Sequence, residues 1–172
     1  EAYMNTGIQR SSATPVGAWT TTTPVGSRQD WKRQPKKNMM DIMVAHKIPY
    51  AATASVAYPE DFIKKLKKAR DIKGPKFFHV YAPCPTGWRL PPEKTIEISR
   101  MATDACVFPL YEVENGVINI NRKPAKKVTF LEYMSMQGRF RHLPASVVDE
   151  IQRGIDREWE ILLKREAFTQ GL

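Results

Sequence analysis

The hydrophobic residues of this chain follow two different periods, which predict both strands and helices. Residues 49–55 (Pro-Tyr-Ala-Ala-Thr-Ala-Ser) and the run from Lys76 to Ala82 are short and apolar, as is typical of buried strands. Between them, a proline followed by two acidic residues at Pro59 marks the start of a helix, and Gly74-Pro75 ends it. This strand–helix–strand order predicts a right-handed crossover between two parallel strands.

The remaining segments complete the predicted fold. Helices are predicted at 37–46, at about 92–106 and at about 145–166, and a hairpin at 110–120 turns at Asn115-Gly116. Residues 1–37 show no regular period. We therefore expect an α/β fold, with a parallel sheet flanked by helices and a C-terminal hairpin and helix. The expected division is 1–145 for the main domain and 146–172 for a C-terminal helical extension.

The composition fits one domain of ordinary size. The chain has 172 residues, of which 42% are hydrophobic, and this is enough to bury a core. No apolar run approaches the ~20 residues that span a bilayer, so we expect no membrane partner. Two cysteines are too few for a disulfide framework in a chain this long, which predicts a reduced, cytoplasmic setting.

The net charge of +9 favours an acidic partner by electrostatic steering, and it equally favours nucleic acid. Part of the charge lies on the crossover helix. One face of that helix carries four lysines, and another carries the apolar residues Phe62, Ile63, Leu66 and Ala69; the lysines are Lys64, Lys65, Lys67 and Lys68. Charge alone does not choose between these partners.

The loop after the second strand is a candidate site, because ligands of parallel sheets bind beyond the carboxyl ends of the strands. Its sequence is Pro-Cys-Pro-Thr-Gly-Trp, from Pro83 to Trp88. A lone cysteine such as Cys84 is most often an inert core thiol. Since the chain has no CxxC pair, its cysteines alone could not hold a zinc ion or an iron–sulfur cluster.

The first eleven residues, Glu-Ala-Tyr-Met-Asn-Thr-Gly-Ile-Gln-Arg-Ser, are rich in small polar side chains and lack a hydrophobic period. Such a loop offers donors and a flexible backbone, which suits a bound diphosphate. A plain surface loop is the alternative. The segment resembles the second half of the thiamine-diphosphate and magnesium motif in the cofactor-binding subunit of pyruvate:ferredoxin oxidoreductases.

Further blocks resemble the same family, the beta subunit of multi-subunit pyruvate synthases, and occur in the family's order. They extend the resemblance from the first residue to about residue 140, and agreement among several unrelated blocks makes it specific. The blocks are Gly17-Ala18-Trp19-Thr20-Thr21, Ile48 to Ser55, Cys84-Pro85-Thr86-Gly87-Trp88 and Gln137-Gly138-Arg139-Phe140.

The resemblance implies thiamine diphosphate anchored through Mg²⁺, which prefers oxygen ligands. Two family ligands lie upstream of Glu1, so the chain is expected to be a C-terminal portion of a longer subunit. The resemblance makes residues 1–145 the C-terminal part of a domain with the thiamine-diphosphate-binding fold. Ala2 resembles the third ligand, through its backbone carbonyl. Asn5 matches the family's active-site Asn, and Thr6 and Gly7 are expected to approach the diphosphate. For Asn5 alone, a turn residue before Gly7 is the alternative.

The resemblance makes Cys84 the fourth ligand of a [4Fe-4S] cluster near the thiamine, because such a cluster needs four cysteines and the other three lie upstream. Trp88 could shield that cluster from water or could simply be packed. Cys106 is predicted to lie in a helix with a structural role. His46, His79 and His142 have no metal-ligand spacing and are assigned no catalytic role.

The implied activity is oxidative decarboxylation of pyruvate with coenzyme A, with electrons passing through the cluster to ferredoxin. Alpha-, gamma- and delta-type subunits are the implied partners, and nucleic acid is not. Val16 departs from the aromatic residue expected in typical pyruvate enzymes, so oxalate or another small 2-oxoacid, without coenzyme A, is the alternative. Outside the enzymes, the alternative is a basic nucleic-acid-binding domain or a non-catalytic interaction subunit.

Overall fold

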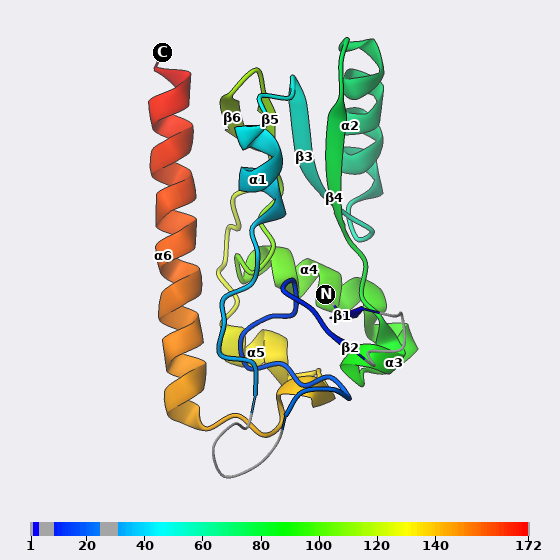
Figure 1. The fold of residues 1–172 in the computed structure, drawn as a ribbon, viewed down its shortest axis with the longest axis vertical. Coiled ribbons are helices and arrows are strands. Elements are labelled where there is room, and N and C mark those ends of the chain that lie inside the picture. The colour runs from blue at the N-terminus through cyan, green and yellow to red at the C-terminus, as the bar shows by residue number, and fades with distance from the viewer. Residues whose placement is uncertain (1, 4–8, 25–30, 172) are drawn as a thin grey trace.

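The computed structural model describes residues 2–3, 9–24 and 31–171 (Figure 1). Its main sheet has the strand order β4-β3-β5-β6. The strands are β3 (Tyr50–Ser55), β4 (Lys76–Tyr81), β5 (Tyr111–Glu114) and β6 (Val117–Ile120). β3 and β4 are parallel, as the crossover predicts, whereas β5 is antiparallel to both β3 and β6. The sheet is therefore mixed, because the predicted hairpin joins it through β5.

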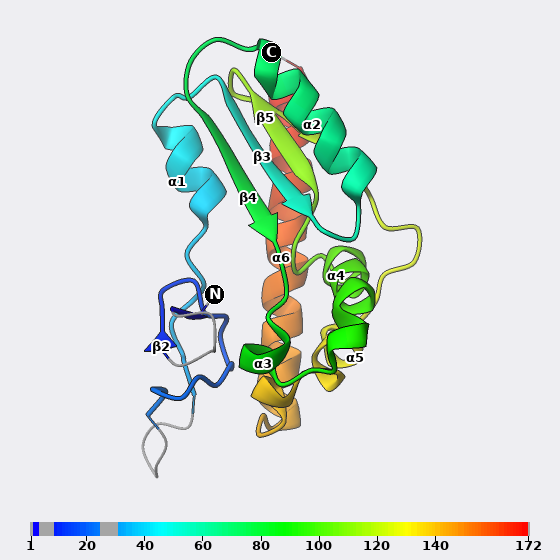
Figure 2. The same cartoon turned by 90° about the vertical axis from the view of Figure 1, so that its right-hand side faces the viewer.

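Helices cover both faces of this sheet, which confirms the α/β prediction. α2 (Pro59–Asp71) lies on one face, and α1 (Met39–Ala45) and α6 (Ala145–Gln170) lie on the other (Figures 1 and 2). Side chains alternate between these faces along β3: Ala52 packs with α2, and Ala51 packs in the cluster that includes Met40 and Leu162. Among the described residues, no helix is both long enough and apolar enough to cross a membrane.

A layer of short helices lies beyond the carboxyl ends of β3 and β4. Figure 2 shows β4 leading directly into this layer. It contains α3 (Pro85–Trp88), η1 (Pro92–Lys94), α4 (Thr95–Asp104), α5 (Phe130–Ser135) and η2 (Gly138–Phe140). The largest core cluster among the described residues fills this layer, with Ile98, Ala102 and Phe140 all fully buried.

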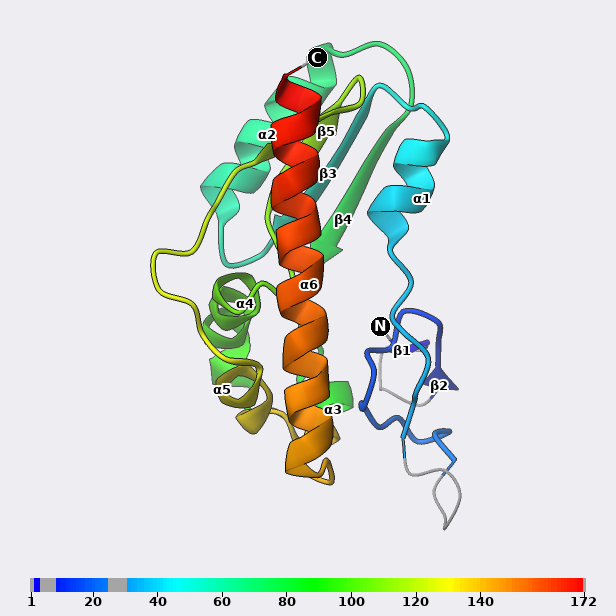
Figure 3. The same cartoon turned by 90° about the vertical axis from the view of Figure 1, so that its left-hand side faces the viewer.

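α6 extends past its predicted end and closes the edge of the sheet. It runs along the whole molecule, from the short helices to β6 (Figure 3). Glu166 accepts a hydrogen bond from the Ile120 N–H at 2.6 Å, and Thr169 accepts one from the Ile118 N–H at 3.0 Å. These hydrogen bonds satisfy backbone N–H groups of β6 that an exposed edge strand would otherwise offer to another chain.

The face of α2 that packs on the sheet differs from the predicted one. Ala69 is buried as expected, but Ile63 and Leu66 are 51% and 45% exposed. Lys65 faces the sheet instead and is 2% exposed; its ammonium donates to the Thr53 carbonyl oxygen at 2.8 Å and to Asp61 at 2.7 Å. The lysine stem covers apolar surface, while its ammonium is hydrogen-bonded to a carbonyl oxygen and paired with a carboxylate, which offsets the cost of burying the charge.

A polar network beside Lys65 explains why cations lie on this face. The Tyr50 hydroxyl donates to Glu112, which also pairs with Lys68 at 3.1 Å. Burial alone would raise the pKa of the Glu112 carboxyl, but the hydrogen bond from Tyr50 and the charge of Lys68 outweigh burial and lower it. Glu112 is therefore ionised in the folded chain at neutral pH.

Replacing Glu112 by glutamine is expected to lower the free energy of unfolding by about 1–3 kcal/mol at pH 7, because a charged hydrogen-bond acceptor is lost. The folded-state pKa lies below the ordinary value of 4.5, so the ionised group stabilises the fold above that pH. This contribution is lost as the pH falls through the folded-state pKa. Urea unfolding of both proteins between pH 3 and 7 tests this, and a pH-independent difference would contradict it.

Several short elements were not predicted from the sequence, although local signals for some of them were present. α5 begins with a capping box, in which Thr129 and Glu132 each bond the other's backbone. α3 begins at Pro85 with Cys84 as its N-cap, although the segment was predicted as a loop. β1 (Ala2–Tyr3) and β2 (Gln9–Arg10) form a small antiparallel pair in the segment predicted to be irregular.

Candidate functional site

The N-terminal motif is described only at its two ends. Ala2, in β1, pairs with Arg10, in β2, and Tyr3 pairs with Gln9. Asn5, Thr6 and Gly7 lie outside the described residues. The pairing brings together the two ends of the segment that carries these predicted diphosphate and active-site residues.

The residues after β2 form a tightly hydrogen-bonded turn region. The Arg10 N–H donates to the Thr22 hydroxyl at 2.9 Å, and the Ser11 N–H donates to Thr14 at 3.0 Å. The Gly17 N–H donates to the Lys32 carbonyl oxygen at 2.9 Å. The Lys32 side chain is 3% exposed, and its ammonium donates to the Gln34 carbonyl oxygen at 2.6 Å. This segment is thus held mainly by its own polar groups rather than by helix or sheet ladders.

Contacts with residues 137–142 hold the N-terminal segment against the rest of the molecule. The Trp19 N–H donates to the Arg139 carbonyl oxygen at 3.0 Å. The Trp19 and His142 rings stack with their centroids 3.8 Å apart and an interplanar angle of 7°. His142 is therefore part of an aromatic contact, and no metal-ligand cluster forms around it among the described residues.

Cys84 lies immediately beyond the carboxyl end of β4, where the sheet rule predicts a site. Its side chain is half-buried, and its Sγ accepts a hydrogen bond from the Gly87 N–H at 3.3 Å. An N–H donor directed at sulfur stabilises a thiolate, the form that ligates iron, and tunes the group it holds. The residues at this turn therefore fit a cluster ligand. They do not supply the other three thiolates that such a cluster needs.

Trp88 ends the turn that begins at Cys84. Its N–H donates to the Cys84 carbonyl oxygen at 2.9 Å, and its side chain is 5% exposed. The indole packs against Tyr81, with ring centroids 5.5 Å apart, and the guanidinium of Arg139 lies 3.9 Å from the centroid of its ring. Packing in the core is thus an observed role of Trp88.

Gly138 allows residues 137–140 to approach the Cys84 turn closely. Its N–H donates to the Arg89 carbonyl oxygen at 3.1 Å. A Cβ at this position would lie 2.7 Å from the Arg89 Cβ, too near for two carbon atoms. Only glycine lets the two backbones meet here.

The four later sequence blocks that carried the family resemblance therefore meet in space. Trp19, from the N-terminal segment, bonds to Arg139, and Arg139 stacks on Trp88 of the Cys84 turn. β3, which contains most of another block, ends beside β4, with Ser55 opposite Tyr81. Segments far apart in the sequence thus converge at the carboxyl edge of the sheet, where ligands bind in such folds.

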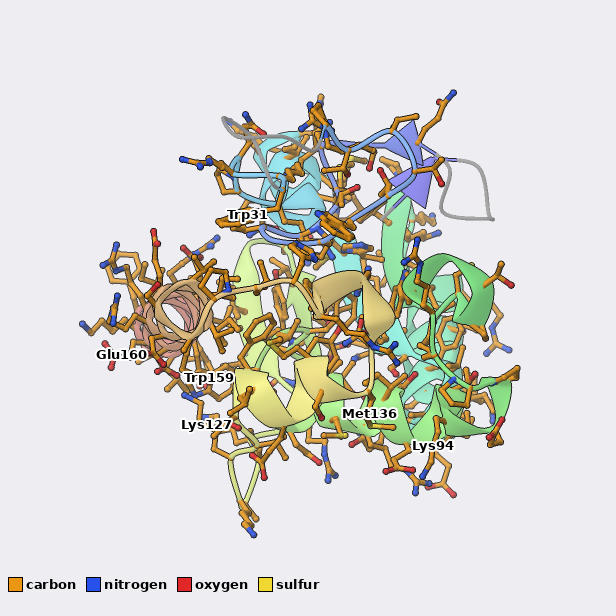
Figure 4. The ribbon with its side chains drawn as sticks, turned by 90° about the horizontal axis from the view of Figure 1, so that it is seen from below. Trp31, Lys94, Lys127, Met136, Trp159 and Glu160 are labelled. Atoms are coloured by element: carbon orange, nitrogen blue, oxygen red, sulfur yellow. The ribbon has the colours of Figure 1, made fainter. Side chains whose placement is uncertain are left out.

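A cavity of about 780 Å³ lies between the N-terminal segment, the sheet and α6. Trp31, from the N-terminal segment, and Trp159, from α6, both line it (Figure 4). Val16, the residue that departs from the pattern of pyruvate enzymes, lies on its wall, as does Cys106. Cys84 is not among the lining residues.

Cys106 is buried, as predicted, but it lies just after a helix rather than within one. α4 ends at Asp104, and Cys106 has a φ of 56°, the left-handed conformation that often follows a helix end. Burial raises the pKa of its thiol to about 11.

In the folded, iron-free chain at pH 8, iodoacetamide is expected to label Cys84 and to leave Cys106 unmodified, because the thiolate is the reactive form and Cys106 is 5% exposed. Peptide mass spectrometry measures both sites. Denaturant should make both cysteines react, as the control. Equal labelling of the two in the folded chain would show that Cys106 is accessible.

Known proteins resemble this chain strongly. It is 55% identical over 166 residues to the ketoisovalerate oxidoreductase subunit VorB of Pyrococcus abyssi, covering 95% of this chain and 53% of that protein. It is 56% identical over 162 residues to the pyruvate synthase subunit PorB of Methanocaldococcus jannaschii, covering 94% of this chain and 54% of that protein. The chain is a relative of the PorB and VorB subunits.

The pyruvate synthase subunit PorB of Thermotoga maritima is 47% identical over 175 residues, which cover 99% of this chain and 54% of that protein. The chain thus spans about half the length of the curated relatives it matches. No protein-family model matches it. The family resemblance found in the sequence blocks is confirmed by these relatives.

Proposed function

We propose that this chain forms part of the beta subunit of a thiamine-dependent 2-oxoacid:ferredoxin oxidoreductase. The convergence of the Cys84 turn, residues 137–140 and the N-terminal segment at the carboxyl edge of the sheet carries this proposal, since these are the family blocks. The names of the PorB and VorB relatives support it. The complex would be cytoplasmic and would include alpha-, gamma- and delta-type subunits.

Each proposed site residue has a distinct task. When bound, thiamine diphosphate would supply the carbanion chemistry of decarboxylation, and a [4Fe-4S] cluster would accept electrons one at a time. The backbone carbonyl of Ala2 would bind Mg²⁺, and Thr6 and Gly7 would approach the diphosphate. Asn5 would donate its amide hydrogen to the oxygen on which negative charge develops. Cys84 would hold the cluster through its thiolate, supported by the Gly87 N–H.

The substrate is proposed to be pyruvate, with coenzyme A as the acyl acceptor and ferredoxin as the electron acceptor. A branched 2-oxoacid is the second candidate. The identity to a ketoisovalerate oxidoreductase subunit, 55%, nearly equals that to a pyruvate synthase subunit, 56%. Val16 is smaller than the aromatic residue expected of pyruvate enzymes, which would leave more room if this position faces the substrate. Oxalate without coenzyme A is a further alternative.

The substrate is tested by viologen reduction with the native complex, purified under anaerobic conditions. Pyruvate plus coenzyme A, ketoisovalerate plus coenzyme A, and oxalate alone are compared at equal concentrations. The proposal predicts the highest kcat/KM with pyruvate. Preference for ketoisovalerate or oxalate would keep the reaction class and replace the substrate. No reduction with any 2-oxoacid would overturn the proposed function.

Asn5→Ala is expected to lower kcat by about 10²-fold, because one donor to the developing oxyanion is lost. Binding of thiamine diphosphate, measured by calorimetry on the cofactor-depleted complex, should change much less. An unchanged kcat would remove the catalytic role of Asn5. A loss of cofactor affinity that accounts for the whole effect would make it a binding residue instead.

A further inference from the structure

The cavity between the N-terminal segment and α6 has the form of a groove along the helix. Its lining residues on α6 recur at steps of three and four, from Val147 through Gly154 and Ile161 to Arg165, so they share one face of that helix. This face is roughly 27 Å long, at 1.5 Å per residue. Gly154 and Ile161 are both exposed, so the groove opens to solvent. A groove of this length suits a segment of polypeptide better than a compact small molecule.

Gly154 lies in the middle of this face, although a helix interior disfavours glycine. Apart from the backbone of α6 itself, no heavy atom of the described residues would lie within 4 Å of a Cβ at this position. At Gly138, by comparison, a Cβ would lie 2.7 Å from the Arg89 Cβ. Packing within the described part of the chain therefore explains Gly138 and does not explain Gly154. A glycine in an open groove lets the backbone of another element approach the helix closely.

The wall that the N-terminal segment contributes is cationic. The stretch from residue 31 to residue 40 has no aspartate or glutamate, and Arg33 and Lys37 line the groove from it. The Arg33 guanidinium lies 5.6 Å from the ring centroid of Trp31, which is a neutral group. The α6 wall carries charges of both signs, so the attraction for carboxylates comes from the N-terminal wall. A partner that places carboxylates against this wall would gain electrostatic complementarity.

We propose that this groove is the docking site for a helix of another subunit of the complex. The docked helix approaches Gly154 closely and places carboxylates against Arg33 and Lys37. Trp31 and Ile161, which line the groove from its two walls, lose contact with water on docking, and such apolar burial drives association. The inference rests on the proposed function in one respect, namely that the chain is a subunit of a larger complex, as its PorB and VorB relatives are named.

Gly154→Ala tests the close approach, with Glu160→Ala as the control, because Glu160 is exposed on α6 and does not line the groove (Figure 4). In the chain alone, Gly154→Ala should raise the urea midpoint of unfolding, since alanine favours a helix and its Cβ has open space. In the complex, the added methyl group meets the docked helix, and the dissociation constant should rise roughly tenfold. Glu160→Ala should leave association unchanged. Native mass spectrometry of a dilution series of the complex measures it.

Wild-type association of Gly154→Ala would overturn the proposal, as would a lower urea midpoint in the chain alone, which would show that the position is already packed. The occupant itself is identified in the native complex with a photoreactive benzophenone amino acid in place of Ile161. Irradiation should join this chain to an acidic segment of another subunit, and the same probe in place of Glu160 should not. A crosslink confined to this subunit or to a second copy of it, or no crosslink, would overturn the inference. If that complex holds thiamine diphosphate and iron, the proposed function still stands.

Discussion

Cys84→Ser is expected to remove about four iron atoms per copy of this chain from the native complex and to abolish 2-oxoacid-dependent viologen reduction. A cluster of this type needs four thiolates, and an alcohol oxygen is a poor substitute for one of them. The chain itself should stay folded. Cys84 is the N-cap of α3, and serine is among the preferred residues at this position.

Cys106→Ser is the matched control, because it makes the same atomic change at the other cysteine. That residue is buried beside α4, away from the Cys84 turn in the chain, and should keep the full iron content. Iron is measured colorimetrically on complexes purified anaerobically. Equal iron in wild type and Cys84→Ser would exclude Cys84 as a ligand, whereas loss of iron in both variants would point to damage to the fold.

Phe140→Ala is expected to lower the free energy of unfolding by about 3–5 kcal/mol, a large part of the stability of a domain this size. Phe140 is fully buried in the largest core cluster, where its ring meets Phe130 edge-on at 5.5 Å. Its removal leaves a cavity between η2 and α5, and the surrounding structure relaxes only partly around such a cavity.

Phe168→Ala serves as the control for this change, since Phe168 is 69% exposed on α6. It should alter the free energy of unfolding by less than about 0.5 kcal/mol. Urea unfolding of the purified chain, followed by circular dichroism, gives both values. A loss at Phe140 no greater than that at Phe168 would show that the cluster around η2 is not a folded core in solution.

Local signals in the sequence predicted much of the architecture. The apolar runs and the Pro59 start predicted β3, α2 and β4 with their parallel pairing, and Asn115-Gly116 predicted the β5–β6 turn. These features depend on residues close together in the chain, so periodicity and turn chemistry reveal them. The division at residue 145 stays a prediction.

The packed face of α2 could not be predicted in the same way. Ile63 and Leu66 form an apolar stripe, yet Lys65 is the buried residue, because its ammonium reaches the Thr53 carbonyl oxygen in the neighbouring strand. Hydrophobic period alone assigns lysine to solvent. Only the polar network on that face of the sheet makes the lysine the better fit.

The sequence indicated the separate segments of the candidate site, but not the contacts that bring them together. The resemblance singled out Cys84 and the block from Gln137 to Phe140 separately, and the sheet rule placed Cys84 at a ligand-binding edge. The stacking of Arg139 on Trp88 joins residues distant in the sequence and has no local pattern. A buried arginine between two aromatic rings therefore emerges only from the tertiary structure.

The cofactor content of the native complex tests the central claim most directly. The complex containing this chain is purified anaerobically, and thiamine diphosphate and iron are determined together, with the Cys84→Ser complex alongside. We predict about one thiamine diphosphate per copy of the chain in both complexes, and about four more iron atoms per copy in the wild type. A complex without thiamine diphosphate, with equal iron in both samples, would contradict the proposed function.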